Sequence, residues 1–124
     1  MTTKLVRIGA RDEHSVDGDV IGVMRQSFGN AEREDVIEDA AFRLVELLSR
    51  LEFALSDSNL SDMPSLAERI AGQCDRIGLR HMAGVAHDLS ICALREDETA
   101  ANAVAARLIR NGEDALFTLT RYID

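Results

Sequence analysis

Apolar residues recur every three or four positions along most of this chain, which is the period of an amphipathic helix. The longest such stretch covers residues 31–55. Acidic residues occupy its first turns, where the positive end of the helix dipole favours them. One face is expected to point toward a core, and it consists of Ile37, Ala40, Leu44, Leu47, Leu51 and Leu55.

A second helix is predicted after a polar linker at residues 56–62. It covers about residues 63–77 and has Pro64 in its first turn, a place that suits proline because it lacks a backbone N–H. It ends at Gly78, which can adopt the left-handed conformation that terminates helices.

Two more helices are predicted, over residues 79–94 and residues 98–123. In the last of these, Gly112 marks a close crossing with another helix or a local bend. The inner faces of these three helices are expected to be Leu66, Ile70, Cys74 and Ile77; Leu79, Met82, Ala83, Ala86, Leu89 and Ala93; and Val104, Leu108, Ala115, Leu116, Leu119 and Ile123.

A short helix is also expected before these four, from about residue 16 or 19 to Phe28, ending at Gly29. Its apolar stripe would be Val20, Val23, Met24 and Phe28. Residues 1–14 are predicted to be a flexible arm, and residues 15–124 a single domain. Because every element is helical and the connections are short, we expect an all-α protein. The simplest arrangement is an antiparallel up-down four-helix bundle with the short N-terminal helix in addition.

The charge and the cysteines limit the classes of function. A net charge of −8 argues against nucleic-acid binding, which needs a basic surface, and against attraction to anionic membranes. No apolar run is long enough to span a bilayer, and the first residues lack the apolar core of a signal peptide, so the cytoplasm is the expected location. Cys74 and Cys92 have no C-x-x-C spacing and are interpreted as small core residues of a reducing compartment.

The sequence contains no pattern typical of an enzyme. It has no P-loop, no dinucleotide-binding fingerprint and no Ser-His-Asp arrangement, so no cofactor is expected. No metal site is expected either, since His87 and Asp88 are adjacent and diverge by about 100° on a helix. His14 falls in the predicted arm, and His81 is expected on a solvated helix face.

Gly72 is the sharpest local signal, because it lies in the middle of a predicted helix. A glycine there costs roughly 0.5–1 kcal/mol relative to alanine. Helical spacing places it with Glu68, Ala71 and Asp75 on the face opposite the apolar stripe. These four residues are predicted to form a flat surface to which a protein partner docks.

A second surface is predicted on the helix at residues 31–55. Phe42, Val45, Leu48 and Phe53 lie off its main apolar stripe. They are expected to receive the N-terminal helix or, as the alternative, a second subunit in a homodimer. Packing within the chain is the favoured interpretation.

Residues 67–78, Ala-Glu-Arg-Ile-Ala-Gly-Gln-Cys-Asp-Arg-Ile-Gly, resemble a family motif. The family is the histidine-containing phosphotransfer (HPt) domain, a helical bundle of bacterial two-component phosphorelays, with the motif A-H-x-L-K-G-x-[SA]-x-x-[LIV]-G. Both glycines match, and the other matching positions are Ala67, Ile70, Cys74 and Ile77. The similarity extends over about residues 36–123.

The chain departs from this motif where the family carries out its chemistry. The phosphate-accepting histidine is replaced by Glu68 and the nearby lysine by Ala71. A carboxylate has no imidazole nitrogen to form a phosphoramidate, and its charge repels a phosphoryl group. The resemblance therefore implies a non-catalytic module that docks a response-regulator receiver or a histidine-kinase domain through Glu68, Ala71, Gly72 and Asp75.

Two alternatives stay open. Residues 86–89, Ala-His-Asp-Leu, also match the start of the motif, so His87 is an alternative phosphate acceptor. In that register Ser90 and Ile91 would take the places of the lysine and the first glycine, and too little chain would follow. The other alternative is a structural bundle that self-associates.

Overall fold

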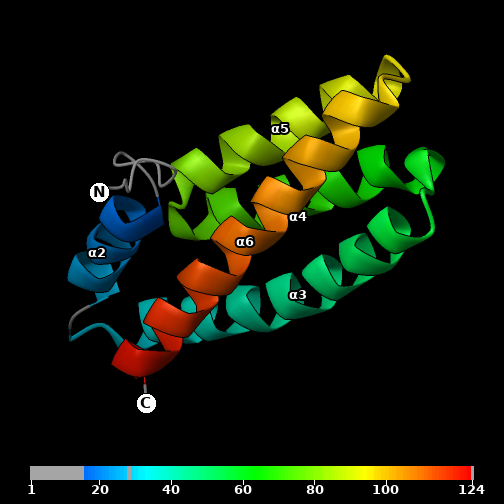
Figure 1. The fold of residues 1–124 in the computed structure, drawn as a ribbon. Helices are drawn as coiled ribbons and strands as arrows, with labels where there is room; N and C mark the ends of the chain where they lie inside the picture. The colour runs from blue at the N-terminus through cyan, green and yellow to red at the C-terminus, as the bar shows by residue number, and fades with distance from the viewer. Residues whose placement is uncertain (1–15, 28, 124) are drawn as a thin grey trace, which may run out of the picture.

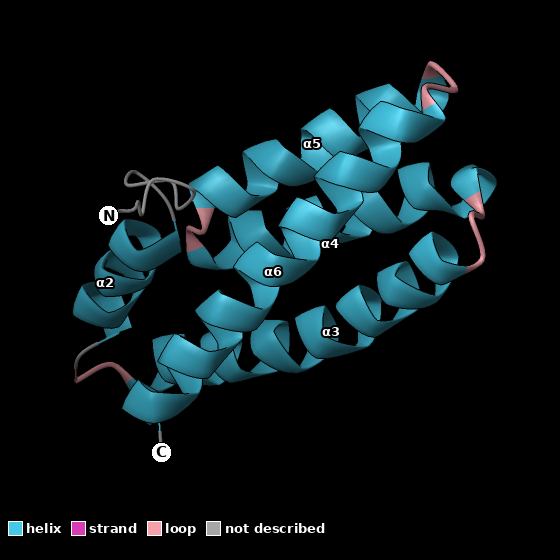
Figure 2. Ribbon diagram, in the orientation of Figure 1, coloured by secondary structure: helices cyan, strands magenta, loops and turns pink. Residues whose placement is uncertain are grey.

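The structure is a computed structural model that describes residues 16–27 and 29–123, and every regular element in this part is helical (Figures 1 and 2). The predicted all-α class is therefore confirmed for the described residues. The predicted arm at residues 1–14 and the side chain of Phe28 lie outside them. The elements are α2 (Val16–Ser27), α3 (Ala31–Ser56), the short 3-10 helix η1 (Leu60–Asp62), α4 (Met63–Ile77), α5 (Arg80–Leu94) and α6 (Glu98–Ile123).

The four longer helices pack around one core. Helix α3 packs against α4 and α6, and α5 packs against the same two helices. Figure 1 shows α6 crossing in front of α4, with α5 and α3 on either side. Successive helices run in opposite directions because the connections between them are short, as Figure 2 shows. Because α4 and α6 both pack against α3 and α5, they lie diagonally across the core from each other. Each presents its outer face to a different side of the molecule.

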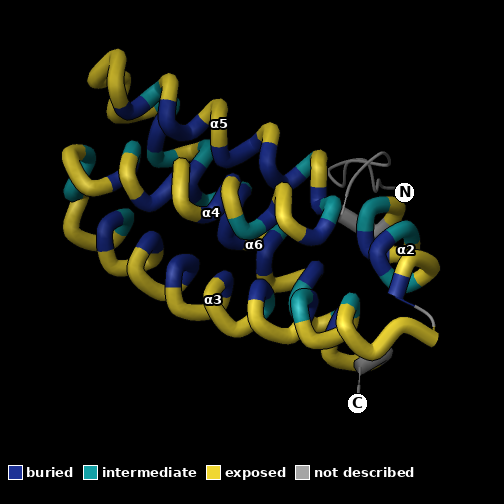
Figure 3. Tube along the Cα trace, turned by 180° about the vertical axis from the view of Figure 1, so that it is seen from behind, coloured by how far each residue is buried: buried dark blue, intermediate teal, exposed yellow. Residues whose placement is uncertain are grey.

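Most residues of the predicted stripes are buried in the core, while Leu55, Val104 and Leu116 are partly buried at its edge, and the side chain of Ile123 lies outside the described part. Buried positions of each helix face the other helices, while exposed positions lie outside (Figure 3). Helix α6 buries a wider face than expected, because Ala101, Ala105 and Ile109 join its predicted stripe. Among the largest fully buried side chains are Ile37, Leu44, Leu51, Ile70, Ile77, Leu79, Met82, Leu89, Leu108 and Leu119.

Two glycines have the structural roles that were predicted for them. Gly78 ends α4 with a φ of 86°, in the left-handed region. Gly112 is buried in α6, and a Cβ atom at this position would overlap the side chain of Leu48 on α3. Helices α3 and α6 therefore cross closely at Gly112, and α6 continues through it as one helix.

The short helix α2 is part of the packed structure. Val20 and Val23 are buried, and α2 contacts α3, α5 and α6. The carboxylate of Asp19 accepts a hydrogen bond of 2.7 Å from the backbone N–H of His81, in the first turn of α5. Leu79, at the N-cap of α5, has no side-chain acceptor of its own, so Asp19 supplies the missing cap from another helix.

Candidate functional site

Helix α4 exposes three of the four residues predicted to form the docking surface. Glu68, Gly72 and Asp75 are exposed on its outer side. Ala71 is only 1% exposed, so its predicted place on the docking surface is wrong. The reason is that α4 packs against both α3 and α5, which gives it a buried face wide enough to include Ala71 beside Ile70.

The structure contains no packing reason for a glycine at position 72. Its backbone is helical, and a Cβ atom built there would have no neighbouring atom within 4 Å. An alanine would therefore stabilise α4 by about 0.5–1 kcal/mol. Gly72 instead leaves a low point on the exposed surface, where another molecule can approach the helix backbone closely.

The structure brings Glu68 and His87 together. Nδ1 of His87 on α5 lies 3.8 Å from Oε2 of Glu68 on α4, and both side chains are about half exposed. An exposed pair of this kind contributes at most about 1 kcal/mol, and only when the histidine is protonated. Glu68, which stands where the resembled motif has its histidine, therefore lies beside His87, the alternative phosphate acceptor.

His81 differs from its predicted place on a solvated face. It is partly buried, and Nε2 of its ring lies 3.4 Å from Nη2 of Arg107 on α6. Its backbone N–H is the group that Asp19 caps. These contacts give His81 a structural role between α2, α5 and α6.

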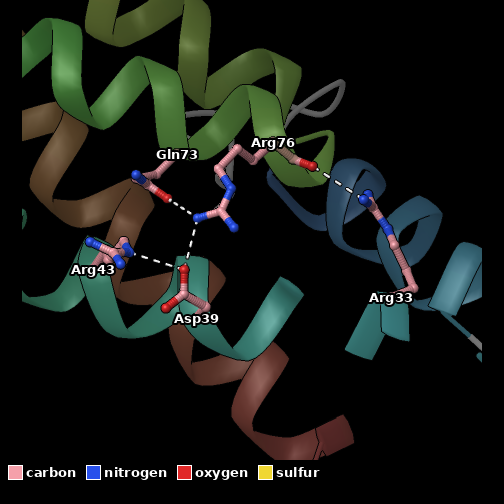
Figure 4. Close-up of polar contacts among 5 residues, drawn as sticks. All are labelled: Arg33, Asp39, Arg43, Gln73 and Arg76. Atoms are coloured by element: carbon pink, nitrogen blue, oxygen red, sulfur yellow. Dashed lines mark hydrogen bonds and ion pairs between the residues drawn. The ribbon is translucent and has the colours of Figure 1, made fainter. Parts of the chain in front are cut away.

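A polar network joins α3 to α4 beside the docking surface (Figure 4). Oδ2 of Asp39 accepts hydrogen bonds from Nη1 of Arg76 at 2.9 Å and from Nε of Arg43 at 3.0 Å. These two hydrogen bonds hold the pKa of Asp39 below its usual value. Arg76 also donates to Gln73, and its backbone carbonyl accepts a hydrogen bond from Arg33. The network links α3 to α4 across the surface of the molecule.

Two adjoining cavities lie along the α3/α4 groove. The first has a volume of about 310 Å³ and is lined by Arg43, Glu46, Leu47, Arg50, Arg69, Gly72 and Gln73. The second has a volume of about 390 Å³, and its lining includes Phe53, Ala54 and Leu66. Arg50 and Arg69 line both cavities. Gly72 therefore borders a concave surface, a feature that helical periodicity alone did not indicate.

The described residues include no group of three or more histidine, cysteine or acidic side chains placed to hold a metal ion. Cys74 and Cys92 are free thiols. Burial raises the pKa of the Cys74 thiol to about 12, so it is neutral at physiological pH and unsuited to nucleophilic chemistry. Among the helices described, none is long and apolar enough to cross a membrane.

Comparison with known proteins identifies no relative of this chain. No protein-family model matches it, and neither a curated protein nor a solved structure does.

Proposed function

We propose that this protein is a non-catalytic, HPt-like docking module of bacterial two-component signalling. In this proposal helices α3 to α6 form an antiparallel up-down four-helix bundle, and α2 is an additional helix. One observation carries the proposal: Gly72 is exposed in the middle of α4 with no structural need for a glycine. It lies beside exposed Glu68 and Asp75, at the position where the HPt motif has its glycine.

The proposed partner is either the receiver domain of a response regulator or a domain of a histidine kinase. Docking would occur on the exposed side of α4, around Glu68, Gly72 and Asp75. Because Glu68 replaces the acceptor histidine, the partner would be bound without receiving or giving a phosphoryl group. The module would act by competing for that partner or by holding two partners together.

The experiment that tests this proposal is direct binding to purified domains. A panel of receiver and histidine-kinase domains from the source organism is titrated against the protein by isothermal titration calorimetry. At least one domain is expected to bind. If no domain in a complete panel binds, the proposed function is wrong.

His87 is the alternative phosphate acceptor because its ring is accessible. It is about half exposed, and the carboxylate of Glu68 faces its Nδ1 atom. In that function the protein would be a phosphotransfer protein.

Self-association is the other candidate, and the outer face of α3 favours it. Phe42, Val45 and Phe53 are 77%, 55% and 70% exposed. The prediction that these side chains pack within the chain is therefore wrong. Leu48 is only 5% exposed and belongs to the core beside Gly112. Phe42 and Phe53 are separated by about three helical turns and therefore lie on the same side of α3.

We expect the protein to form weak dimers through this face of α3, since exposed aromatic side chains favour burial at an interface. Multi-angle light scattering should show an average mass that rises above the monomer mass as concentration increases. The double variant Phe42→Ser/Phe53→Ser should stay monomeric at every concentration. A wild-type protein that remains monomeric at high concentration would exclude this dimer.

A further inference from the structure

The first of the two α3/α4 cavities has a charge opposite to that of the whole protein. We call it the arginine cavity, and its charged lining consists of Arg43, Arg50, Arg69 and Glu46. Three positive groups thus face one negative group, in a chain whose net charge is −8. The cavity is therefore a local positive site on an acidic protein, and such a site attracts anionic groups.

The arginines of this cavity are incompletely neutralised. Arg69 has no hydrogen bond or ion pair with any residue that the structure describes. Nη2 of Arg50 lies 3.5 Å from Oε2 of Glu46, and this pair is exposed. Arg43 shares the carboxylate of Asp39 with Arg76, so one acid faces two cations there. Guanidinium groups in this state retain donors for a carboxylate.

The second cavity adds an apolar wall to the same groove. We call it the phenylalanine cavity, and its apolar lining is Phe53, Ala54 and Leu66. Asp57 and Asp62 line it too, so this end of the groove does not attract anionic groups. Arg50 and Arg69 stand between the two cavities, because they line both. A ligand that spans the groove would place anionic groups among the arginines and an apolar group against Phe53, which is otherwise largely exposed to solvent.

From this arrangement we infer that the α3/α4 groove binds an acidic segment of a partner protein. Carboxylates of the segment occupy the arginine cavity, and one apolar side chain packs against Phe53. Gly72 lines the arginine cavity, so its missing side chain lets the backbone of the segment approach α4. The inference deepens the proposed function and rests on it for the class of partner, while the chemistry of the groove can be tested without that partner.

The test uses a fluorescein-labelled peptide of glutamate, glycine and serine with one phenylalanine. A matched peptide carries lysine in place of each glutamate. Fluorescence anisotropy at low ionic strength should show binding of the acidic peptide in preference to the basic one. Raising the ionic strength from about 0.01 M to about 1 M should weaken this binding at least ten-fold, because the Debye length falls from about 30 Å to about 3 Å.

The diagnostic variant is Arg69→Glu, because Arg69 has no partner among the described residues that its loss would disturb. It should weaken binding of the acidic peptide about ten-fold, since attraction to a carboxylate becomes repulsion. Arg110→Glu is the control, with the same change in net charge at an exposed position of α6. It should leave the affinity unchanged within about two-fold.

Three outcomes would overturn this inference. The first is that the basic peptide binds as tightly as the acidic one. The second is that Arg69→Glu and Arg110→Glu weaken binding equally. The third is that inorganic phosphate alone binds at least as tightly as the peptide, which would assign the arginine cavity to a small oxyanion. If the peptide binds as expected but no receiver or kinase domain does, the groove inference stands and the proposed function is wrong.

Discussion

Replacing Gly112 with leucine should lower the free energy of unfolding by about 1–3 kcal/mol. Gly112 is buried at the crossing of α3 and α6, and even a Cβ atom there would overlap the side chain of Leu48. Overpacking a filled core costs about this much, because side chains and backbone must shift. The gain in helix propensity, about 0.5–1 kcal/mol, offsets only part of the cost. Urea denaturation followed by circular dichroism measures the change.

Gly84→Leu is the matched control for this substitution. Gly84 lies in α5, is exposed, and has no atom within 4 Å of the position of a Cβ. The same substitution should therefore leave stability unchanged or raise it by about 0.5–1 kcal/mol. Equal effects at the two positions would contradict the close crossing of α3 and α6.

Replacing Gly72 with arginine should weaken binding of the partner domain at least about 100-fold, which corresponds to about 2.7 kcal/mol. The arginine side chain would fill the space through which a partner approaches the backbone of α4. The protein itself should be as stable as the wild type or slightly more stable, because Gly72 is exposed and has no neighbours that an added side chain would meet. Titration calorimetry measures the affinity, and urea denaturation measures the stability.

Ala103→Arg is the matched control for charge. Ala103 is exposed on α6, which lies diagonal to α4. This variant gains the same positive charge on a face far from the proposed docking surface, so it should bind the partner like the wild type. If Gly72→Arg also binds like the wild type, the partner does not dock on α4. If both variants bind weakly, the effect comes from net charge and the docking surface is again wrong.

Local patterns were sufficient to predict the helices and most of their inner faces. Apolar spacing identified the buried stripes, and Gly78 ends its helix in the left-handed conformation that glycine favours. Gly112 was predicted to mark a close crossing or a local bend, and the structure shows the crossing. The buried stripes and the end of α4 depend on residues within a few turns of each other, whereas the partner of Gly112 at the crossing, Leu48, lies on another helix.

The features that could not be predicted depend on which helices are neighbours. Ala71 flanks the apolar stripe of α4, and it is buried because α4 packs against two helices. Asp39 and Arg76 are far apart in the sequence, and only the packing of α3 on α4 brings them within 2.9 Å. The arginine cavity has the same origin, since both helices contribute to its lining.

The environment of the alternative acceptor also depends on helix packing. No local pattern indicated that His87 on α5 would lie beside Glu68 on α4. The two interpretations of the motif, one with Glu68 at the acceptor position and one with His87 there, therefore concern neighbouring residues on one surface. A single chemical measurement can distinguish them.

That measurement is the transfer of a radioactive phosphoryl group to the wild-type protein from a phosphorylated receiver or kinase domain that binds it. Docking without transfer, the central claim of this account, predicts that the partner keeps its label or loses it to water, and that this chain stays unlabelled. An acid-labile label on this chain that disappears in the His87→Gln variant would contradict the claim and establish a phosphotransfer protein that uses His87.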